Sequence, residues 1–128
     1  MAGPIVFISR HRIAEARRGE FEHAYGQAVE LINATKPGTA LFAAYVDDRG
    51  TEVRVVHAFP DAAAMVAHFE GSQERSQSAS GLITPAGFEI YGQAPATAVD
   101  QLRREAATAD AGIELFGDPL GGFLRVPR

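Results

Sequence analysis

The sequence predicts an α+β domain with the ferredoxin-like order β-α-β-β-α-β, in which two helices cover one face of a four-stranded antiparallel sheet. Two observations predict this class. Apolar residues at helical spacing alternate along the chain with short runs of β-branched and aromatic residues, and turns rich in glycine and proline separate these segments. The 128 residues, 46% of them hydrophobic, suit one domain. We expect this domain over residues 1–94. A C-terminal helix-strand extension over residues 95–128 would pack on the same domain or on a dimer partner.

The first strand and the first helix are predicted near the N-terminus. The run "IVFIS", residues 5–9, precedes a polar and basic break, as expected for a strand that leads into a loop. From residue 17 to residue 34, apolar side chains recur every three or four positions, which is the stripe of an amphipathic helix. The members of this stripe are Phe21, Tyr25, Ala28, Val29 and Ile32. Pro37 and Gly38 then predict a turn.

A hairpin is predicted next, from strands at residues 39–46 and 52–59 joined by "DDRGT". The two-residue alternation of a strand places one set of side chains on one face of the second strand and the remainder on the other. The first set is Val53, Val55, His57 and Phe59, and the second is Arg54, Val56 and Ala58. Both faces are partly apolar, so we expect both to be covered.

A second helix is predicted after Pro60, with Asp61 as its N-cap. Its predicted buried stripe follows the i, i+3, i+4, i+7 pattern and consists of Ala62, Met65, Val66 and Phe69. On a helical wheel His68 lies about 60° from Met65, outward from the stripe, so we expect it on the flank of the helix. Residues 71–81 are small and polar, and the sequence fits either a loop or a weaker continuation of the helix.

The remaining elements are a fourth strand and the extension. "GFEIYG", residues 87–92, predicts a strand in which Phe88 and Ile90 alternate with Glu89 and Tyr91. A third helix is expected over residues 97–109, with Val99, Leu102 and Ala106 as its inner stripe and Gly112 as its stop. The apolar fragments at residues 113–116 and 123–126 fit short strands or a tail packed over another surface.

The two apolar faces of the sheet predict a homodimer. Helices cover only one face of a ferredoxin-like sheet. A second copy of the same sheet is the economical way to cover the other face.

With these elements in place, the sequence resembles the dimeric α+β barrel proteins of the antibiotic biosynthesis monooxygenase type. The resemblance rests on "ARRGEFEHAYGQAVELINATKPGT" and on "VRVVHAFPDAAAMVAHFEGS", in which an aromatic residue ends a strand and an Ala-His pair follows in the next helix. It covers residues 4–92. The resemblance implies a pocket between the helices and the sheet of each subunit. Some members of the family oxidise quinols or polycyclic phenols with molecular oxygen and without metal or flavin.

Two histidines are the candidate catalytic residues. Oxygenation without a cofactor needs a base that deprotonates an electron-rich phenol in a dry cavity, and histidine titrates nearest to neutral pH. His57 lies mid-strand beside Phe59, and His68 matches the Ala-His position of the family. The structural alternatives are a buried, hydrogen-bonded core histidine and a helix-edge residue. His11 and His23 lie among charged residues, in an expected loop and on a polar helix face, and we expect no functional role for either.

Five further residues are candidates for substrate binding. Tyr45 and Tyr91 lie near strand ends, where a phenol can orient a substrate oxygen, although such tyrosines more often pack their rings and leave the hydroxyl in water. Phe7, Phe59 and Met65 are the predicted apolar lining, although core packing is the commoner role of such residues.

Several function classes lack their sequence signals. There is no G-x-G-x-x-G, P-loop, H-E-x-x-H or G-x-S-x-G motif, and no cysteine. We therefore predict no cofactor and no metal. The basic residues form short clusters in a chain of net charge -4, which argues against nucleic acid as a partner. No segment approaches the roughly 20 apolar residues that span a bilayer, and we expect a cytoplasmic protein without membrane contact.

Two functions follow from these observations. The first is a cofactor-independent monooxygenase, an oxidoreductase that acts on a small aromatic compound of the quinol or phenol type. The second is a non-catalytic dimeric module that binds a small apolar ligand or a protein, using the extension.

Overall fold

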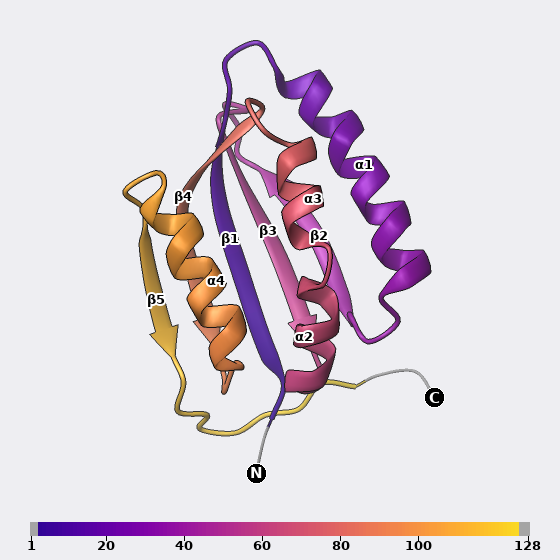
Figure 1. The fold of residues 1–128 in the computed structure, drawn as a ribbon, viewed down its shortest axis with the longest axis vertical. Helices are drawn as coiled ribbons and strands as arrows, with labels where there is room; N and C mark the ends of the chain where they lie inside the picture. The colour runs from indigo at the N-terminus through magenta and orange to yellow at the C-terminus, as the bar shows by residue number, and fades with distance from the viewer. Residues whose placement is uncertain (1–2, 126–128) are drawn as a thin grey trace.

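A computed structural model describes residues 3–125 of the chain. Its elements are, in order, β1 (Ile5–Ile13), α1 (Arg18–Thr35), β2 (Leu41–Val46), β3 (Glu52–Phe59), α2 (Ala62–Phe69), α3 (Ser72–Ser78), β4 (Ile83–Tyr91), α4 (Ala96–Ala107) and β5 (Gly112–Phe116) (Figure 1). The strands form one sheet in the order β2-β3-β1-β4-β5. The pairs among β1 to β4 are antiparallel, and β5 lies parallel to β4. The predicted ferredoxin-like core is confirmed, and the sheet of one chain is open.

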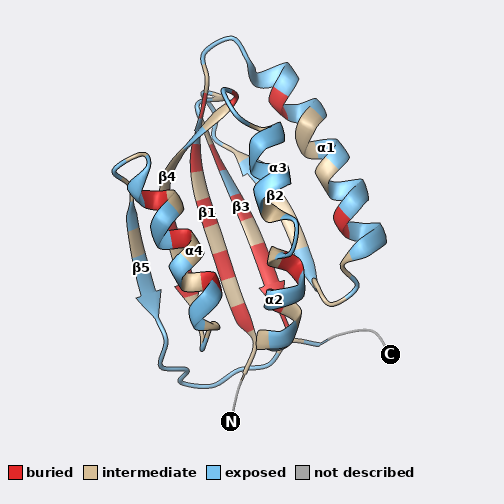
Figure 2. Ribbon diagram, viewed as in Figure 1, coloured by how far each residue is buried: buried red, intermediate tan, exposed pale blue. Residues whose placement is uncertain are grey.

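All four helices lie on one face of the sheet (Figure 1). Alternate residues of β1 point toward the helices and are buried, from Ile5 to Ile13. The core divides into two clusters (Figure 2). One joins α2 and α4 to the sheet around Phe59, Met65 and Leu102, and the other joins α1 to the opposite end of the sheet around Phe21.

Several boundaries differ from the prediction. β1 continues to Ile13 because its alternation persists through the polar residues after Ser9. β4 starts at Ile83, and its register against β1 shifts between Arg10 and His11, as at a β-bulge. Residues 72–78 form a helix of their own, which starts after Gly71 at φ 78°. These longer strands carry polar side chains onto the helix-covered face.

The extension forms the predicted helix and one strand. α4 ends at Ala107, and the backbone of Asp110 takes a left-handed conformation at φ 52° that turns the chain into β5. Gly112 is therefore not the stop of the helix but the first residue of β5. Residues 117–125 form no regular structure, and Val126 of the expected last fragment lies outside the described residues.

The buried face of α2 is rotated relative to the prediction. Val66, expected in the core, is 41% exposed, whereas His68, expected on the flank, is 3% exposed. His68 can be buried because its Nδ1 hydrogen-bonds to the Thr39 hydroxyl at 2.8 Å. Asp61 caps this helix as predicted, since its carboxylate accepts from the Ala64 amide at 2.8 Å.

The face of the sheet that the helices leave uncovered is apolar at one end and carries the ion pairs Arg10–Glu89 and Arg54–Glu52 beyond it. The alternation of β1 and β3 places Val6, Ile8 and Val56 on this face, and Phe116 stacks on Tyr91 there at 5.0 Å between ring centres. The predicted homodimer would cover this surface. Within residues 3–125, no helix has the length and apolar character needed to cross a bilayer.

Candidate functional site

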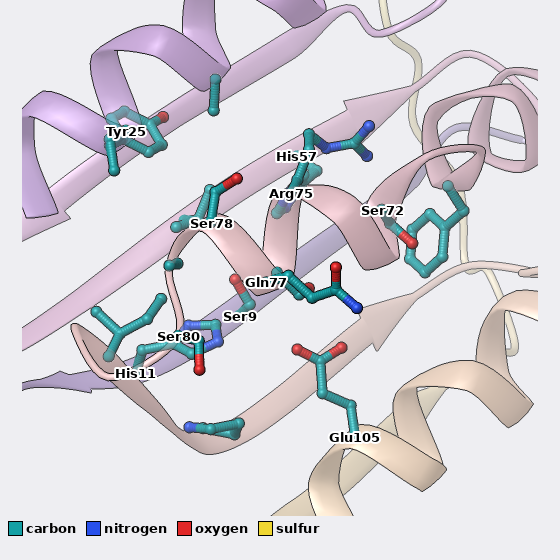
Figure 3. Close-up of a pocket in the computed structure, with 18 of the residues that line it drawn as sticks. Ser9, His11, Tyr25, His57, Ser72, Arg75, Gln77, Ser78, Ser80 and Glu105 are labelled. Atoms are coloured by element: carbon teal, nitrogen blue, oxygen red, sulfur yellow. The ribbon is translucent and has the colours of Figure 1, made fainter.

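A cavity of about 560 Å³ lies between the helices and the sheet. Its floor comes from β1 to β4, and its walls come from α1, α3 and α4 with the loop after α3 (Figure 3). The floor residues include Phe7, Ser9, His11, Phe42, Val55, His57 and Phe88. The lining combines the apolar and aromatic floor with many polar side chains from α3, α4 and the loop after α3.

His57 lies on the cavity floor in a fixed orientation. Its ring stacks on Phe7 with 4.5 Å between centres, and its Nδ1 lies 3.0 Å from the Phe7 carbonyl oxygen. A carbonyl only accepts, so Nδ1 carries the proton and Nε2 of the neutral ring has a free lone pair. Burial lowers the pKa of His57 to about 4, so the ring is neutral at pH 7.

His68 lies beside His57, with 5.2 Å between ring centres and the planes nearly perpendicular. Burial, together with the nearby His57 and Arg75, lowers the pKa of His68 to about 3. Its Nδ1 partner, the Thr39 hydroxyl, can donate or accept, so either tautomer fits. Arg75 holds the end of α2 in place, because its guanidinium donates to the carbonyl oxygens of His68 and Glu70.

His11 also lines this cavity, although the sequence placed it in a loop without a role. It is 8% exposed, on the helix-facing side of β1, and burial lowers its pKa to about 4. Its Nδ1 is buried without a hydrogen-bond partner. The alternation from Ile5 through Ser9 would have predicted this position had the strand been extended through the arginines that flank His11.

Tyr25 of α1 is a second cavity residue that the sequence did not single out. Its ring stacks on Phe42 at 5.3 Å, and its hydroxyl is buried without a partner. Burial raises the pKa of Tyr25 to about 12, so the hydroxyl remains protonated at neutral pH. Tyr25 belongs to the apolar stripe predicted for the first helix, and this place predicted only a role in core packing.

The structure does not bring Tyr45 or Tyr91 to the cavity. Tyr45 is 64% exposed and pairs in register with Arg54 on the opposite face of the sheet. Tyr91 lies on the same outer face, where it donates to Glu89 at 2.8 Å. The cause is strand alternation, since the neighbouring Phe42 and Ile90 take the inner face.

Of the three predicted apolar lining residues, only Phe7 lines the cavity. Phe59 and Met65 are fully buried in the core cluster beside it. The ring of Phe59 lies 5.1 Å from that of His68 and packs against this histidine.

The extension contributes one wall of the cavity. Gln101, Leu102 and Glu105 of α4 line it, as does Thr108 just after the helix. Gln101 donates to the Ser72 hydroxyl, which joins α4 to α3. The Glu105 side chain points inward (Figure 3), and burial raises its pKa above the usual value for a glutamate.

Solved structures with a similar fold give this arrangement a context. MupZ from Pseudomonas fluorescens is 20% identical, with a TM-score of 0.67 over 96% of this chain and 95% of MupZ. SnoaB from Streptomyces nogalater, a cofactor-independent oxygenase, is 17% identical, with a TM-score of 0.60 over 70% of this chain and 92% of SnoaB. A candidate antibiotic biosynthesis monooxygenase from Bacteroides thetaiotaomicron is 19% identical, with a TM-score of 0.56 over 63% of this chain and 80% of that one.

The chain has the fold of the antibiotic biosynthesis monooxygenases. The resemblance drawn from the sequence is thus confirmed for the fold. The match to MupZ spans nearly the whole chain and so includes the extension, whereas the match to SnoaB covers a smaller part. No protein-family model and no curated protein matches the sequence.

Proposed function

We propose that the protein is a cofactor-independent monooxygenase that oxidises a hydroxylated aromatic compound in this cavity, with His57 as the base. The observation that carries the proposal is the geometry of His57. Its Nδ1 proton is held by the Phe7 carbonyl oxygen, which leaves the Nε2 lone pair of this buried ring to accept a proton in a cavity lined by aromatic residues. The fold shared with SnoaB, a cofactor-independent oxygenase, supports this direction.

The reaction balances without a cofactor. Nε2 of His57 accepts the hydroxyl proton of the substrate, and the resulting phenolate transfers one electron to molecular oxygen. The phenoxyl radical and superoxide then combine at a ring carbon to form a peroxide. His57 returns its proton to this peroxide, and the resulting hydroperoxide loses water together with the hydrogen of the same ring carbon to give a quinone. One oxygen atom of the gas thus enters the product and the other leaves as water. We propose that the protonated Tyr25 hydroxyl, which lines the cavity without a partner among the described residues, donates a hydrogen bond to the substrate.

The pKa of the base decides which substrates suit this site. A proton that moves from a phenol with a pKa of about 10 to a histidine with a pKa of about 4 climbs about 8 kcal/mol. A turnover of about 10 per second corresponds to a barrier of about 16 kcal/mol. Deprotonation would thus take about half of the barrier, so we expect faster oxidation of phenols whose hydroxyl is acidified by a conjugated carbonyl.

Oxygen consumption with a panel of quinols and hydroxylated polycyclic compounds tests the proposal. We expect turnover in the wild type, at least a hundredfold loss in His57→Leu, and a smaller loss in His68→Leu. His23→Leu is the matched control, because His23 is exposed on α1. With isotopically labelled oxygen gas, one labelled atom should appear in the quinone. Absence of turnover across the panel, or full activity in His57→Leu, would refute the proposal.

A non-catalytic module that binds a small apolar ligand is the second candidate. It is favoured by the low pKa values of His57 and His68, which make both weak bases. In that case the same panel should bind to the protein without oxygen uptake.

We also propose that the protein is a homodimer through the uncovered face of its sheet. Ile8 and Val56 lie side by side on this face, next to the register pair of Val6 and Ala58. Native mass spectrometry should report two subunits, and Ile8→Glu should give a monomer. A monomeric wild type at micromolar concentration would refute the dimer.

A further inference from the structure

Two polar side chains without partners line the cavity, Glu105 from α4 and His11 from the floor strand β1. The Glu105 carboxyl points into the cavity (Figure 3) and forms no hydrogen bond or ion pair within residues 3–125. His11 Nδ1 is fully buried and also unpaired in this part of the chain. An unpaired buried polar atom such as His11 Nδ1 costs about 1–3 kcal/mol, and a ligand in the cavity would satisfy it. Glu105 is partly exposed, so its carboxyl is accessible to the same ligand.

Neighbouring charged and polar groups do not satisfy Glu105. Arg103 and Arg104 are exposed on the outer side of α4. The Arg75 guanidinium is engaged by two backbone carbonyl oxygens, and the Gln101 amide by the Ser72 hydroxyl. Glu105 therefore faces the cavity without a counterion among the described residues.

An aromatic floor joins His11 to the proposed base. His11 lies four residues beyond Phe7 along β1, a distance of about 13 Å at the rise of a strand. Phe88 lies between them, at 6.0 Å from the ring of His11 and 5.9 Å from that of Phe7. Phe7 in turn stacks on His57. A flat ligand of several fused rings would fit along this floor and reach both ends.

We propose that Glu105 and His11 bind a second hydroxyl group of the ligand, at the end of the cavity opposite to His57. A hydroxyl matches both residues, because it donates to a Glu105 carboxyl oxygen and accepts from the imidazole N–H of His11. An anionic group would be repelled by Glu105, and a cationic group would meet the guanidinium of Arg75 in the same cavity. This inference rests on the proposed function for the position of the first hydroxyl.

Three matched probes test the second hydroxyl: 2-hydroxyanthracene, 2,6-dihydroxyanthracene and 6-methoxy-2-hydroxyanthracene. Their affinities are measured by fluorescence titration without oxygen, so that binding is separated from turnover. We expect the diol to bind the wild type about tenfold more tightly than either other probe, because only the diol donates a hydrogen bond to Glu105. The methoxy compound matches the shape of the diol but cannot donate.

Four variants locate the effect. Glu105→Leu and His11→Phe should each reduce the diol preference to about one without weakening 2-hydroxyanthracene. Glu105→Gln can still accept a hydrogen bond and should retain part of the preference for the diol. If His11→Phe does not fold, the comparison of Glu105→Gln with Glu105→Leu still tests the inference. Asp100→Asn, exposed on the same helix, should leave the preference intact.

Several outcomes would overturn the inference. These are equal binding of the diol and 2-hydroxyanthracene to the wild type, equal binding of the diol and the methoxy probe, binding of none of the three, or a preference that survives Glu105→Leu. The proposed oxygenase activity fails separately. A diol preference that depends on Glu105, in a protein that consumes no oxygen, would support this subsite and refute the monooxygenase.

Discussion

Three buried, neutral histidines make the protein sensitive to acid. The pKa values of His11, His57 and His68 lie at about 4, 4 and 3, against 6.5 for an ordinary histidine. The unfolded chain therefore binds more protons than the folded protein between about pH 6.5 and pH 4, so stability is full above pH 6.5 and falls as the pH drops. At pH 5 protonation lowers the free energy of the unfolded state by about 2 kcal/mol for each of these histidines, whereas the buried histidines of the folded protein stay neutral. Together the three histidines should lower the free energy of unfolding by about 6 kcal/mol, a large part of the 5–15 kcal/mol that is typical for a domain.

Urea unfolding followed by circular dichroism at pH 8, 6.5 and 5 measures this loss, at one protein concentration throughout. We expect the free energy of unfolding to fall by about 6 kcal/mol in the wild type between pH 8 and pH 5, and by about 4 kcal/mol in His11→Gln. His23→Gln, exposed on α1, should behave as the wild type. The carboxyl groups are common to all three proteins and cancel in the comparison. An unfolding free energy that is flat from pH 8 to pH 5, or the same decline in His11→Gln, would show that these histidines are not buried in neutral form.

Two further predictions concern the fold. Met65→Ala should destabilise the protein by about 2–5 kcal/mol in urea, because Met65 is fully buried, whereas Val66→Ala on the exposed side of α2 should cost under about 1 kcal/mol; similar costs would contradict the rotated face of α2. Gly92→Ala should lower the melting temperature, because its φ of 104° disfavours a side chain and its Cβ would lie 2.8 Å from the Pro4 carbonyl oxygen. Gly26→Ala in α1, where no atom lies within 4 Å of the new Cβ, should stabilise the protein by about 0.5–1 kcal/mol.

The sequence predicted the element order well and the site only in part. Order depends on apolar periodicity and on turns, which are local signals. Alternation along one strand grouped His57 with Val55 and Phe59, but it did not say which side of the sheet this group faces; the structure turns the group toward the helices. Tyr45 and Tyr91 were chosen as candidates for their places near strand ends, but strand alternation turns both toward the outer face. His11 was missed because the two arginines beside it gave its segment the composition of a loop, although they point to the other face.

The extension changes what the cavity can recognise. The ferredoxin-like core supplies the aromatic floor and the pair of histidines, but these residues carry no charged group that could distinguish the far end of a ligand. α4 packs against β4 and β5 through Ala98, Leu102 and Ala106, and this packing fixes the side of the helix that faces the cavity. Glu105 and Gln101 then follow from helical spacing around Leu102. The segment predicted as an extension of the domain thus forms one wall of the cavity, and a ligand bound there would meet groups that the ferredoxin-like core alone does not supply.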